Sequence, residues 1–348
     1  MEYRFLGNSG LKISVLSFGN WLTNNDPKVL ENTKQIVKRC YESGVNFFDT
    51  AEAYGRGEAE RQMGEAIKAL NVPREDLVIS TKIFFGTVEE GKSKINRTGT
   101  SRKHVIEGLT ASLKRLQLDY VDVVLSHRYD HETPIEETCR AFNHVIEKGM
   151  AFYWGTSEWS AEQITSAMGV CEKLGLIKPI TEQPQYNMLV REKLESEFVP
   201  LFEEYKLGTT VWSPLAGGLL TGKYNDEVPK ESRVANADAA VKKIYDKMFF
   251  DEKIYEKRRK ALKELAELAK ELGCTQAQLA LAWVIYNKDV SCALFGASSL
   301  AQVDDNMKAI DIYKKLTPEI LERIEKILET RPERKMNWKS WQPFPARR

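Results

Sequence analysis

Short apolar runs alternate with amphipathic helical segments along the whole of this 348-residue chain. One such helical segment, residues 133–149, begins with Thr133 as a candidate cap and Pro134 in the first turn, and it ends at Gly149. The eight candidate strands lie at residues 14–19, 46–51, 77–82, 121–127, 151–157, 181–187, 209–215 and 291–298. This repetition predicts parallel strands that are joined by right-handed crossovers.

Two architectures fit eight such units, an open doubly wound sheet and a closed (β/α)8 barrel. No linker or change in composition divides the chain, and the first helix lacks the G-x-G-x-x-G phosphate fingerprint of an open dinucleotide-binding sheet. We therefore expect a single α/β domain over residues 1–348, a (β/α)8 TIM barrel. Residues 1–13 are expected to form a β-hairpin that closes the floor of the barrel.

Long polar segments follow two of the candidate strands, at residues 83–100 and 216–251. Both should lie at the C-terminal face, where barrel enzymes keep their sites, and loops of this length are typically functional lids or disorder. The basic C-terminal tail, residues 331–348, carries two tryptophans, Trp338 and Trp341, which are expected to pack against the barrel.

The composition excludes several classes of protein. Lys and Arg total 51 against 50 for Asp and Glu, so the net charge of +1 gives no electrostatic reason to bind nucleic acid. Five scattered cysteines without a C-x-x-C pair suggest reduced thiols. Neither a signal peptide nor an apolar run approaching about 20 residues is present, so we expect no membrane insertion and a cytoplasmic location.

Three consecutive apolar strands each end in one ionisable residue: Asp49, Lys82 and His127. Alternation along a strand places each of them on the face that its apolar neighbours share, so all three can project into one mouth of the barrel. Taken singly, each has a plain explanation, because a strand-end Asp or Lys is usually solvated and a lone His is usually structural. Their coincidence favours a site in which Lys82 offsets the desolvation of Asp49.

Tyr54 follows Asp49 by five residues and completes the set. An ammonium group beside its hydroxyl should lower the tyrosine pKa towards neutrality, which suits a general acid. His127 can donate a hydrogen bond to the same substrate oxygen. Because no metal-ligand cluster accompanies these groups, they suit polarising a carbonyl for hydride attack.

The C-terminal half of the chain contains residues suited to binding a hydride donor. Ser157 and Gln183 end two strands with groups suited to a carboxamide, and Trp212 can stack on a flat ring. Residues 212–223 supply glycines and Lys223 for a pyrophosphate, and residues 296–306 begin a helix with two serines. A structural turn explains either of these stretches, taken alone, equally well.

Six motifs in this order resemble the aldo-keto reductase family over essentially the whole chain. They are FFDTAEAYG (47–55), STK (80–82), VDVVLSHR (121–128), WGTSEWS (154–160), WSPLAGGLLTGKY (212–224) and GASSLAQVDDN (296–306). Finer features are similar to the branch that contains voltage-gated potassium channel β subunits and their plant and microbial relatives. The resemblance implies a barrel that reduces aldehydes or ketones to alcohols with NADP(H), Tyr54 being the proton donor and Asp49, Lys82 and His127 completing the catalytic tetrad.

The resemblance also implies a set of cofactor-binding positions that runs from the nicotinamide to the adenosine. They are Trp21, Asp49, Ser157, Gln183, Trp212, Ser213, Pro214, Leu215, Ala216, Gly217, Lys223, Arg233, Gly296, Ser298, Gln302, Asp305 and Asn306. Glu158 stands where the family often has Asn and animal channel subunits have Arg, so no cofactor contact is assigned to it.

Two functions remain open at this point. In the first, a small carbonyl compound is the substrate of a working reductase. In the second, the chain is a regulatory β subunit that binds the cofactor, docks onto the cytoplasmic domain of a channel and retains slow or vestigial chemistry. His127 favours the first, because animal channel subunits carry Asn there. Relatives in the channel branch form tetramers, which adds a homo-oligomer to the expected partners.

Overall fold

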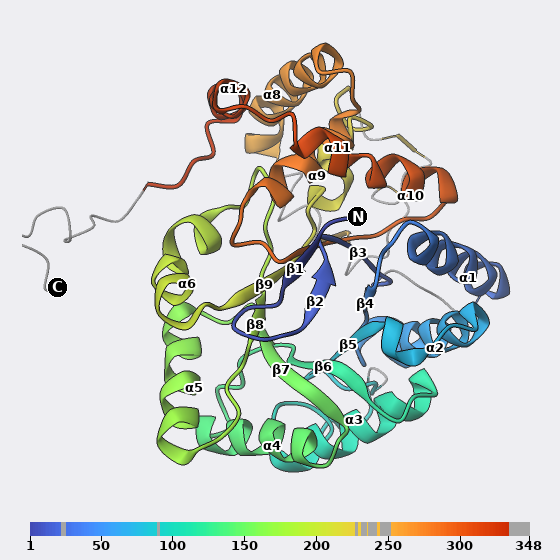
Figure 1. Ribbon diagram of the computed structural model, residues 1–348, viewed down its shortest axis with the longest axis vertical. Coiled ribbons are helices and arrows are strands. Elements are labelled where there is room, and N and C mark those ends of the chain that lie inside the picture. The colour runs from blue at the N-terminus through green and yellow to red at the C-terminus, as the bar shows by residue number, and fades with distance from the viewer. Residues whose placement is uncertain are drawn as a thin grey trace, which may run out of the picture.

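A computed structural model describes residues 1–21, 26–88, 91–226, 229–230, 235, 242–243 and 252–333 (Figure 1). Within these residues, eight parallel strands close a barrel in the order β10-β3-β4-β5-β6-β7-β8-β9. The strands are β3 (Leu16–Gly19), β4 (Phe47–Asp49), β5 (Val78–Ile83), β6 (Val121–Ser126), β7 (Ala151–Ser157), β8 (Thr181–Gln183), β9 (Gly208–Trp212) and β10 (Cys292–Phe295). Each falls inside or within one residue of an expected run, so the predicted (β/α)8 barrel is confirmed.

Helices surround the barrel (Figure 1). The α-helices are α1 (Pro27–Glu42), α2 (Glu58–Leu70), α3 (Arg102–Leu116), α4 (Ile135–Glu147), α5 (Ala161–Leu174), α6 (Val199–Tyr205), α8 (Glu252–Glu271), α9 (Gln276–Tyr286), α10 (Leu300–Met307), α11 (Ala309–Tyr313) and α12 (Pro318–Leu328). Shorter helical turns are η1 (Tyr54–Gly57), η2 (Arg74–Asp76), η3 (Lys193–Glu197) and η4 (Ala216–Thr221).

The two sides of the barrel wall bury two separate apolar cores. Phe47 belongs to the cluster inside the barrel, together with Val78, Val123 and Leu125, whereas Phe48 belongs to the larger cluster under the helices. This is the alternation that the sequence predicts. It places Asp49 on the same side of the wall as Phe47, facing the interior.

The N-terminal hairpin closes the floor of the barrel, as expected. β1 (Tyr3–Phe5) pairs antiparallel with β2 (Lys12–Ser14), and the buried side chains of Leu6 and Ile13 join the interior core. Gly7 has φ +60°, and a Cβ atom there would lie 2.2 Å from the carbonyl oxygen of Ile180. Only glycine fits this close approach between the hairpin and the barrel wall.

One expected helix start is wrong. Helix α4 begins at Ile135 with Pro134 as its cap residue, and no described side chain caps it. Thr133 instead donates its hydroxyl proton to Asp130 Oδ2 at 2.7 Å. The same Asp130 oxygen accepts a hydrogen bond from the Thr100 N–H, also at 2.7 Å, so it ties the start of α3 to the loop before α4.

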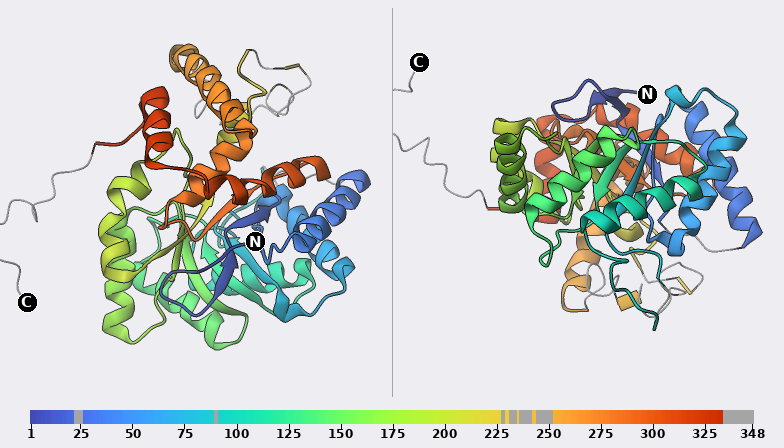
Figure 2. Two further views of the ribbon diagram at one scale, coloured as in Figure 1. Left: turned by 45° about the horizontal axis from the view of Figure 1, so that its top comes forward. Right: turned by 90° about the horizontal axis from the view of Figure 1, so that it is seen from below.

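The segment after β5 leaves the barrel at the end opposite the hairpin (Figure 2). This is the C-terminal face, as predicted. The residues described from the second long loop begin with η4, and most of residues 227–251 lie outside the described part of the chain, as do Trp338 and Trp341 of the tail. No helix among the described residues is long and apolar enough to cross a membrane.

Candidate active site

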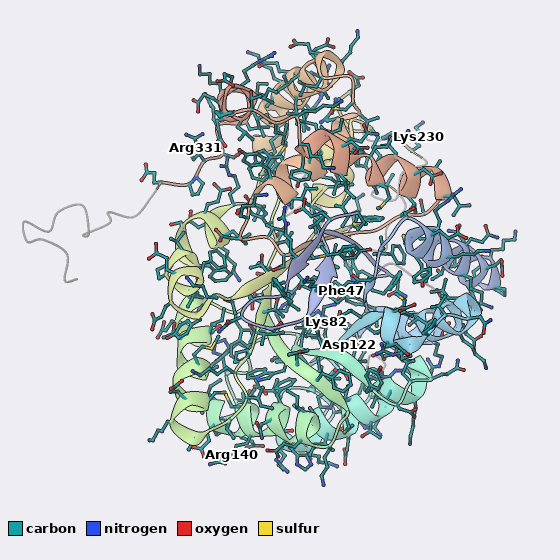
Figure 3. All side chains as sticks on the ribbon, in the orientation of Figure 1. Phe47, Lys82, Asp122, Arg140, Lys230 and Arg331 are labelled. Carbon is teal, nitrogen blue, oxygen red and sulfur yellow. The ribbon has the colours of Figure 1, made fainter. Side chains whose placement is uncertain are left out.

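An ion pair between Lys82 and Asp49 lies at the C-terminal end of the barrel interior, and Figure 3 shows Lys82 near the middle of the ring of strands. Lys82 Nζ lies 2.5 Å from Asp49 Oδ2, and the side chains are 0% and 5% exposed. Lys82 also donates to the carbonyl oxygen of Thr50 at 2.7 Å. Burial acts to lower the pKa of Lys82, but the charge and hydrogen bonds of Asp49 and Tyr54 together outweigh it, so the pKa is raised and the side chain stays charged.

The other carboxylate oxygen of Asp49 accepts two hydrogen bonds. Ser80 Oγ donates to Asp49 Oδ1 at 2.6 Å, which follows from the register, because Ser80 is the β5 residue paired with Asp49. Gln183 Nε2 donates to the same oxygen from β8 at 3.1 Å. These partners offset much of the free-energy cost of burying the Asp49 carboxylate.

Tyr54 reaches the ion pair from the turn after β4. In η1, Gly55 and Arg56 have φ of +54° and +56°, and this tight turn follows Tyr54 directly. Lys82 Nζ lies 3.2 Å from Tyr54 Oη, the geometry of a hydrogen bond. The three side chains therefore form one chain of contacts from Asp49 through Lys82 to Tyr54.

The expected net lowering of the Tyr54 pKa is wrong for this arrangement. Burial raises the pKa of Tyr54 above its ordinary value, and the Asp49 carboxylate acts in the same direction. The charges of Lys82 and Arg128 act to lower it, as expected for Lys82, but they do not outweigh burial. The phenol is consequently protonated at neutral pH.

His127 lies beside Tyr54 at the same mouth. The ring centroids are 5.7 Å apart at 78°, an edge-to-face contact, and Phe85 packs edge-on against the imidazole from the loop after β5, at 5.0 Å. Burial, reinforced by the charges of Lys82 and Arg128, lowers the pKa of His127 well below its ordinary value, so the ring is neutral. Its Nδ1 atom is buried and has no hydrogen-bond partner among the described residues.

Three of the expected nicotinamide residues end adjacent strands. Ser157 Oγ donates to the carbonyl oxygen of Gln183 at 2.9 Å, so β7 and β8 are joined at the mouth. The indole Nε1 of Trp212 donates to Glu158 Oε1 at 2.9 Å. Trp21 follows β3 and is 38% exposed.

The segment expected to hold the pyrophosphate folds into a compact turn. Ser213, Ala216, Gly217 and Gly218 all have positive φ, at 54°, 49°, 64° and 99°. Ser213 Oγ accepts from the Gly217 N–H at 3.1 Å, and the N–H groups of Ala216 and Gly218 also bond within the turn. The backbone donors expected for a phosphate are thus partly engaged in shaping the loop.

Of the other residues expected to bind the phosphates, three lie in or beside this turn and one lies outside the described residues. Pro214 and Leu215 lie in the same turn. A Cβ atom on Gly218 would lie 3.1 Å from Lys223 Nζ, so this ammonium group lies beside the turn. Arg233 lies outside the described residues.

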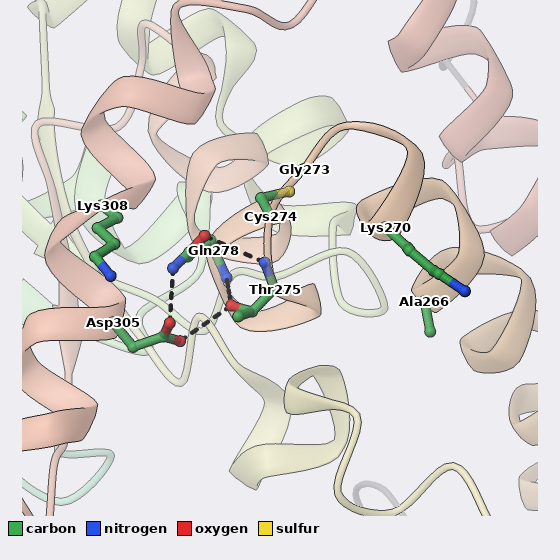
Figure 4. Close-up of a pocket in the computed structure, with 8 residues that line it drawn as sticks. All are labelled: Ala266, Lys270, Gly273, Cys274, Thr275, Gln278, Asp305 and Lys308. Atoms are coloured by element: carbon green, nitrogen blue, oxygen red, sulfur yellow. Dashed lines mark hydrogen bonds between the residues drawn. The ribbon is translucent and has the colours of Figure 1, made fainter.

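The residues expected at the adenosine end gather around the start of α10. Gln302 Oε1 accepts from the Ser298 N–H at 2.8 Å, Ser299 caps the helix, and Gly296 lies in the loop before it. Asp305 turns towards α9, where its two oxygens accept from Gln278 Nε2 at 2.7 Å and Thr275 Oγ1 at 3.0 Å (Figure 4). Asn306 is buried.

Four further groups shape the site and were not assigned from the sequence. Ser80 and the Thr50 carbonyl complete the surroundings of Lys82 and Asp49. Glu52 Oε1 accepts from the N–H groups of Phe84 and Gly86, both at 2.8 Å, and so fixes the start of the loop after β5. Glu158 holds the Trp212 indole. Of these groups, only Ser80 could have been assigned from the sequence, because it shares its strand face with Lys82.

The fold and site define a class: a parallel eight-stranded barrel with a polar cluster of Tyr54, Lys82, Asp49 and His127 at its C-terminal mouth. Comparison with known proteins agrees with that class. The sequence profile of the aldo/keto reductase family matches residues 15–329. The chain therefore belongs to the aldo/keto reductase family and is an oxidoreductase of that type.

Two plant relatives are similar over nearly their whole length. A protein of Arabidopsis thaliana named "Probable voltage-gated potassium channel subunit beta" is 49% identical over 335 residues, which cover 96% of this chain and 98% of the relative. A protein of Oryza sativa subsp. japonica with the same name is 48% identical over 335 residues, with the same coverage. The resemblance to the channel β subunit branch is thus confirmed.

Proposed function

We propose that this chain reduces aldehydes or ketones to alcohols with NADP(H), and that Tyr54 donates the proton. The observation that carries the proposal is the contact chain from Asp49 through Lys82 to Tyr54, with neutral His127 against the same tyrosine ring. These groups converge where a carbonyl oxygen can accept two hydrogen bonds. The family generally uses nicotinamide cofactors, which supports the choice of hydride donor.

The residues around the mouth fit such a cofactor. Ser157 and Gln183 present hydroxyl and amide groups at neighbouring strand ends, the Trp212 ring lies beside them, and Lys223 lies next to the turn at residues 213–218. Leu215, with φ −100°, is followed by Ala216, with φ +49°, and such a pair of opposite backbone hands forms a concavity that suits anions. When bound, NADPH supplies the hydride. The preference for NADPH over NADH is part of the proposal and rests on Lys223, Ser298 and Gln302.

Each residue of the tetrad has a defined task. Tyr54 is protonated because burial raises its pKa, so it can deliver the phenolic proton to the carbonyl oxygen. The ammonium of Lys82 then stabilises the tyrosinate that remains, and Asp49 keeps that ammonium charged and in place. His127, being neutral, can donate one hydrogen bond to the substrate oxygen without adding charge.

The experiment compares Tyr54→Phe with the parent for NADPH oxidation on a panel of aldehydes and ketones. The phenylalanine keeps the ring contact with His127 and removes the acidic proton, so kcat should fall by at least about 100-fold. Cofactor binding, followed by quenching of protein fluorescence, should change little. Equal rates in both proteins, or no turnover of any carbonyl compound by the parent, would contradict the proposal.

A second candidate rests on the names of the two plant relatives, which are those of channel β subunits. In this role the chain docks, as a homo-oligomer, onto the cytoplasmic domain of a potassium channel and keeps its cofactor bound. Salt-resistant co-purification with such a domain supports this role, and free migration of both proteins in gel filtration counts against it. Either function places the protein in the cytoplasm.

A further inference from the structure

Arg128 follows His127 directly, and its guanidinium group lies at the mouth of the barrel. Its Nη1 atom donates to the carbonyl oxygen of His127 and, at 3.4 Å, to Ser157 Oγ. Its Cζ atom lies 5.7 Å from the centroid of the Phe85 ring, which itself packs against the His127 imidazole. The guanidinium group therefore lies between the loop after β5 and the end of β7, beside the proposed catalytic groups.

The charge of Arg128 is not balanced by a carboxylate of any described residue. Within the described part of the chain it forms no ion pair, and its Nε and Nη2 atoms have no acceptor at hydrogen-bond distance. The neighbouring cations differ, since Lys82 is paired with Asp49 and Lys193 with Glu158. Arg128 is half-buried, so its open edge is accessible to a small molecule.

The four groups of the tetrad sum to no net charge. The Lys82 and Asp49 charges cancel, His127 is neutral because its pKa is lowered, and Tyr54 is a neutral phenol because its pKa is raised. Arg128 lies at the same mouth, because its guanidinium group lies over the Phe85 ring that packs against the His127 imidazole. Among these five groups, Arg128 thus supplies the one unbalanced charge.

We propose that Arg128 selects carbonyl substrates that carry a carboxylate group near the carbonyl carbon. The Nε and Nη2 atoms form the edge of the guanidinium group that binds a carboxylate through two parallel hydrogen bonds. The ring of Phe85, whose centroid lies 5.7 Å from the guanidinium carbon, offers an apolar wall for the carbon skeleton. The inference rests on the proposed function, because it names the substrate class of the same site.

The test uses matched pairs of aldehydes, 4-oxobutanoate with butanal and 2-formylbenzoate with benzaldehyde. The measured quantity is the ratio of kcat/KM for the charged member to that for the uncharged member. In the parent this ratio should favour the carboxylate, and in Arg128→Met it should fall by about 10- to 100-fold, the range for a hydrogen bond to a charged group. Arg128→Lys should retain part of the preference, because it keeps the charge but loses the planar fork.

Arg140→Met is the matched control. Arg140 lies on the outer surface of α4, where it pairs with Glu136, and Figure 3 shows it at the periphery. The substitution removes the same charge from a screened position, so the ratio should stay that of the parent. Equal ratios in the parent and in Arg128→Met would overturn the inference and leave the proposed function intact.

If the parent reduced no aldehyde, the proposed function would be contradicted. A binding measurement then tests the inference independently of turnover. Benzoate and its neutral isostere benzamide are titrated calorimetrically into the parent and into Arg128→Met. Tighter binding of benzoate by the parent, lost in the variant, supports a carboxylate site at Arg128 independently of turnover. Equal binding of the two compounds by the parent would overturn it.

Discussion

The indole Nε1 of Trp212 and the carboxylate of Glu158 form a hydrogen bond of 2.9 Å between the ends of β9 and β7. Glu158 has φ +59°, a left-handed conformation that residues other than glycine rarely adopt. Its carboxylate also accepts from the Gln185 N–H at 2.6 Å and from Lys193 Nζ at 2.9 Å. Burial raises the pKa of this carboxyl, but Lys193 and these hydrogen bonds outweigh it, so the pKa is lowered and the group stays ionised.

Glu158→Ala should therefore release the Trp212 ring. We expect the free energy of unfolding to fall by about 1–3 kcal/mol, because three donors lose their acceptor. The near-ultraviolet circular dichroism of the indole should weaken, and the Kd for NADPH should rise severalfold. Glu158→Gln is the matched control, since its amide oxygen can still accept from Trp212. If both variants leave the dichroism and the Kd unchanged, Glu158 does not orient the ring.

Lys82→Met should be destabilising as well as inactive. It leaves the Asp49 carboxylate buried without its counter-ion, which should lower the free energy of unfolding by about 3–5 kcal/mol. The double variant Lys82→Met with Asp49→Asn removes both charges and should recover much of that loss while remaining inactive. Urea denaturation of the single and double variants measures this. A double variant that is no more stable than Lys82→Met would show that the ion pair is not the source of the loss.

Glu182 should make stability depend on pH. It is fully buried on β8, burial raises its pKa to about 8, and its Oε1 atom has no hydrogen-bond partner in the described part of the chain. Because the unfolded carboxyl titrates at its ordinary lower pKa, the folded state binds more protons between about pH 5 and 8. The free energy of unfolding should therefore fall as the pH rises through this range, by up to about 1.4 kcal/mol per pH unit.

Glu182→Gln should remove this contribution, so that its stability falls less steeply with pH than that of the parent. Denaturant midpoints at several pH values between 5 and 8 provide the measurement. Glu264→Gln, at an exposed position, is the control and should follow the parent. Parallel pH profiles for the parent and Glu182→Gln would show that Glu182 is not the titrating group.

Gly7→Ala should destabilise the protein by disrupting the packing of the N-terminal hairpin against the floor of the barrel. The new methyl group would overlap the Ile180 carbonyl oxygen at 2.2 Å, and φ at this position is +60°. We expect a loss of about 3 kcal/mol or more. Gly149→Ala is the matched comparison, because Gly149 has φ +71° with no described atom within 4 Å of the added one. Its cost should be only about 1–2 kcal/mol, and similar losses at both positions would exclude the overlap as the cause.

Strand positions and the convergence of the tetrad could be predicted because both follow from local pattern. Alternation along each strand decides which residues face the interior, and this alone predicts that Asp49, Lys82 and His127 share one mouth of the barrel. The contact between Glu158 and Trp212 could not be predicted in this way. It joins residues 54 positions apart and depends on a left-handed backbone conformation that the residue type at Glu158 does not suggest.

Two other differences between the predictions and the structure arise because a tertiary effect outweighs a local preference. Thr133 has a residue type suited to capping, but Asp130 takes its hydroxyl proton and leaves the helix start to Pro134. The Tyr54 pKa depends on the balance between Lys82 and burial, and the extent of burial is fixed only by tertiary packing around the turn after β4. Sequence spacing indicates that the partners are present but not which effect is larger.

The hydrogen bond from Gln183 to Asp49 joins strands on opposite sides of the barrel, 134 positions apart in the chain. During synthesis on a ribosome, the first half of the protein therefore emerges with Asp49 and Lys82 already able to pair, but without the amide that completes the carboxylate. Only when β8 has left the exit tunnel can the ring of strands close around them. A nascent chain that stalls before Gln183 should thus hold the reactive groups without a finished site.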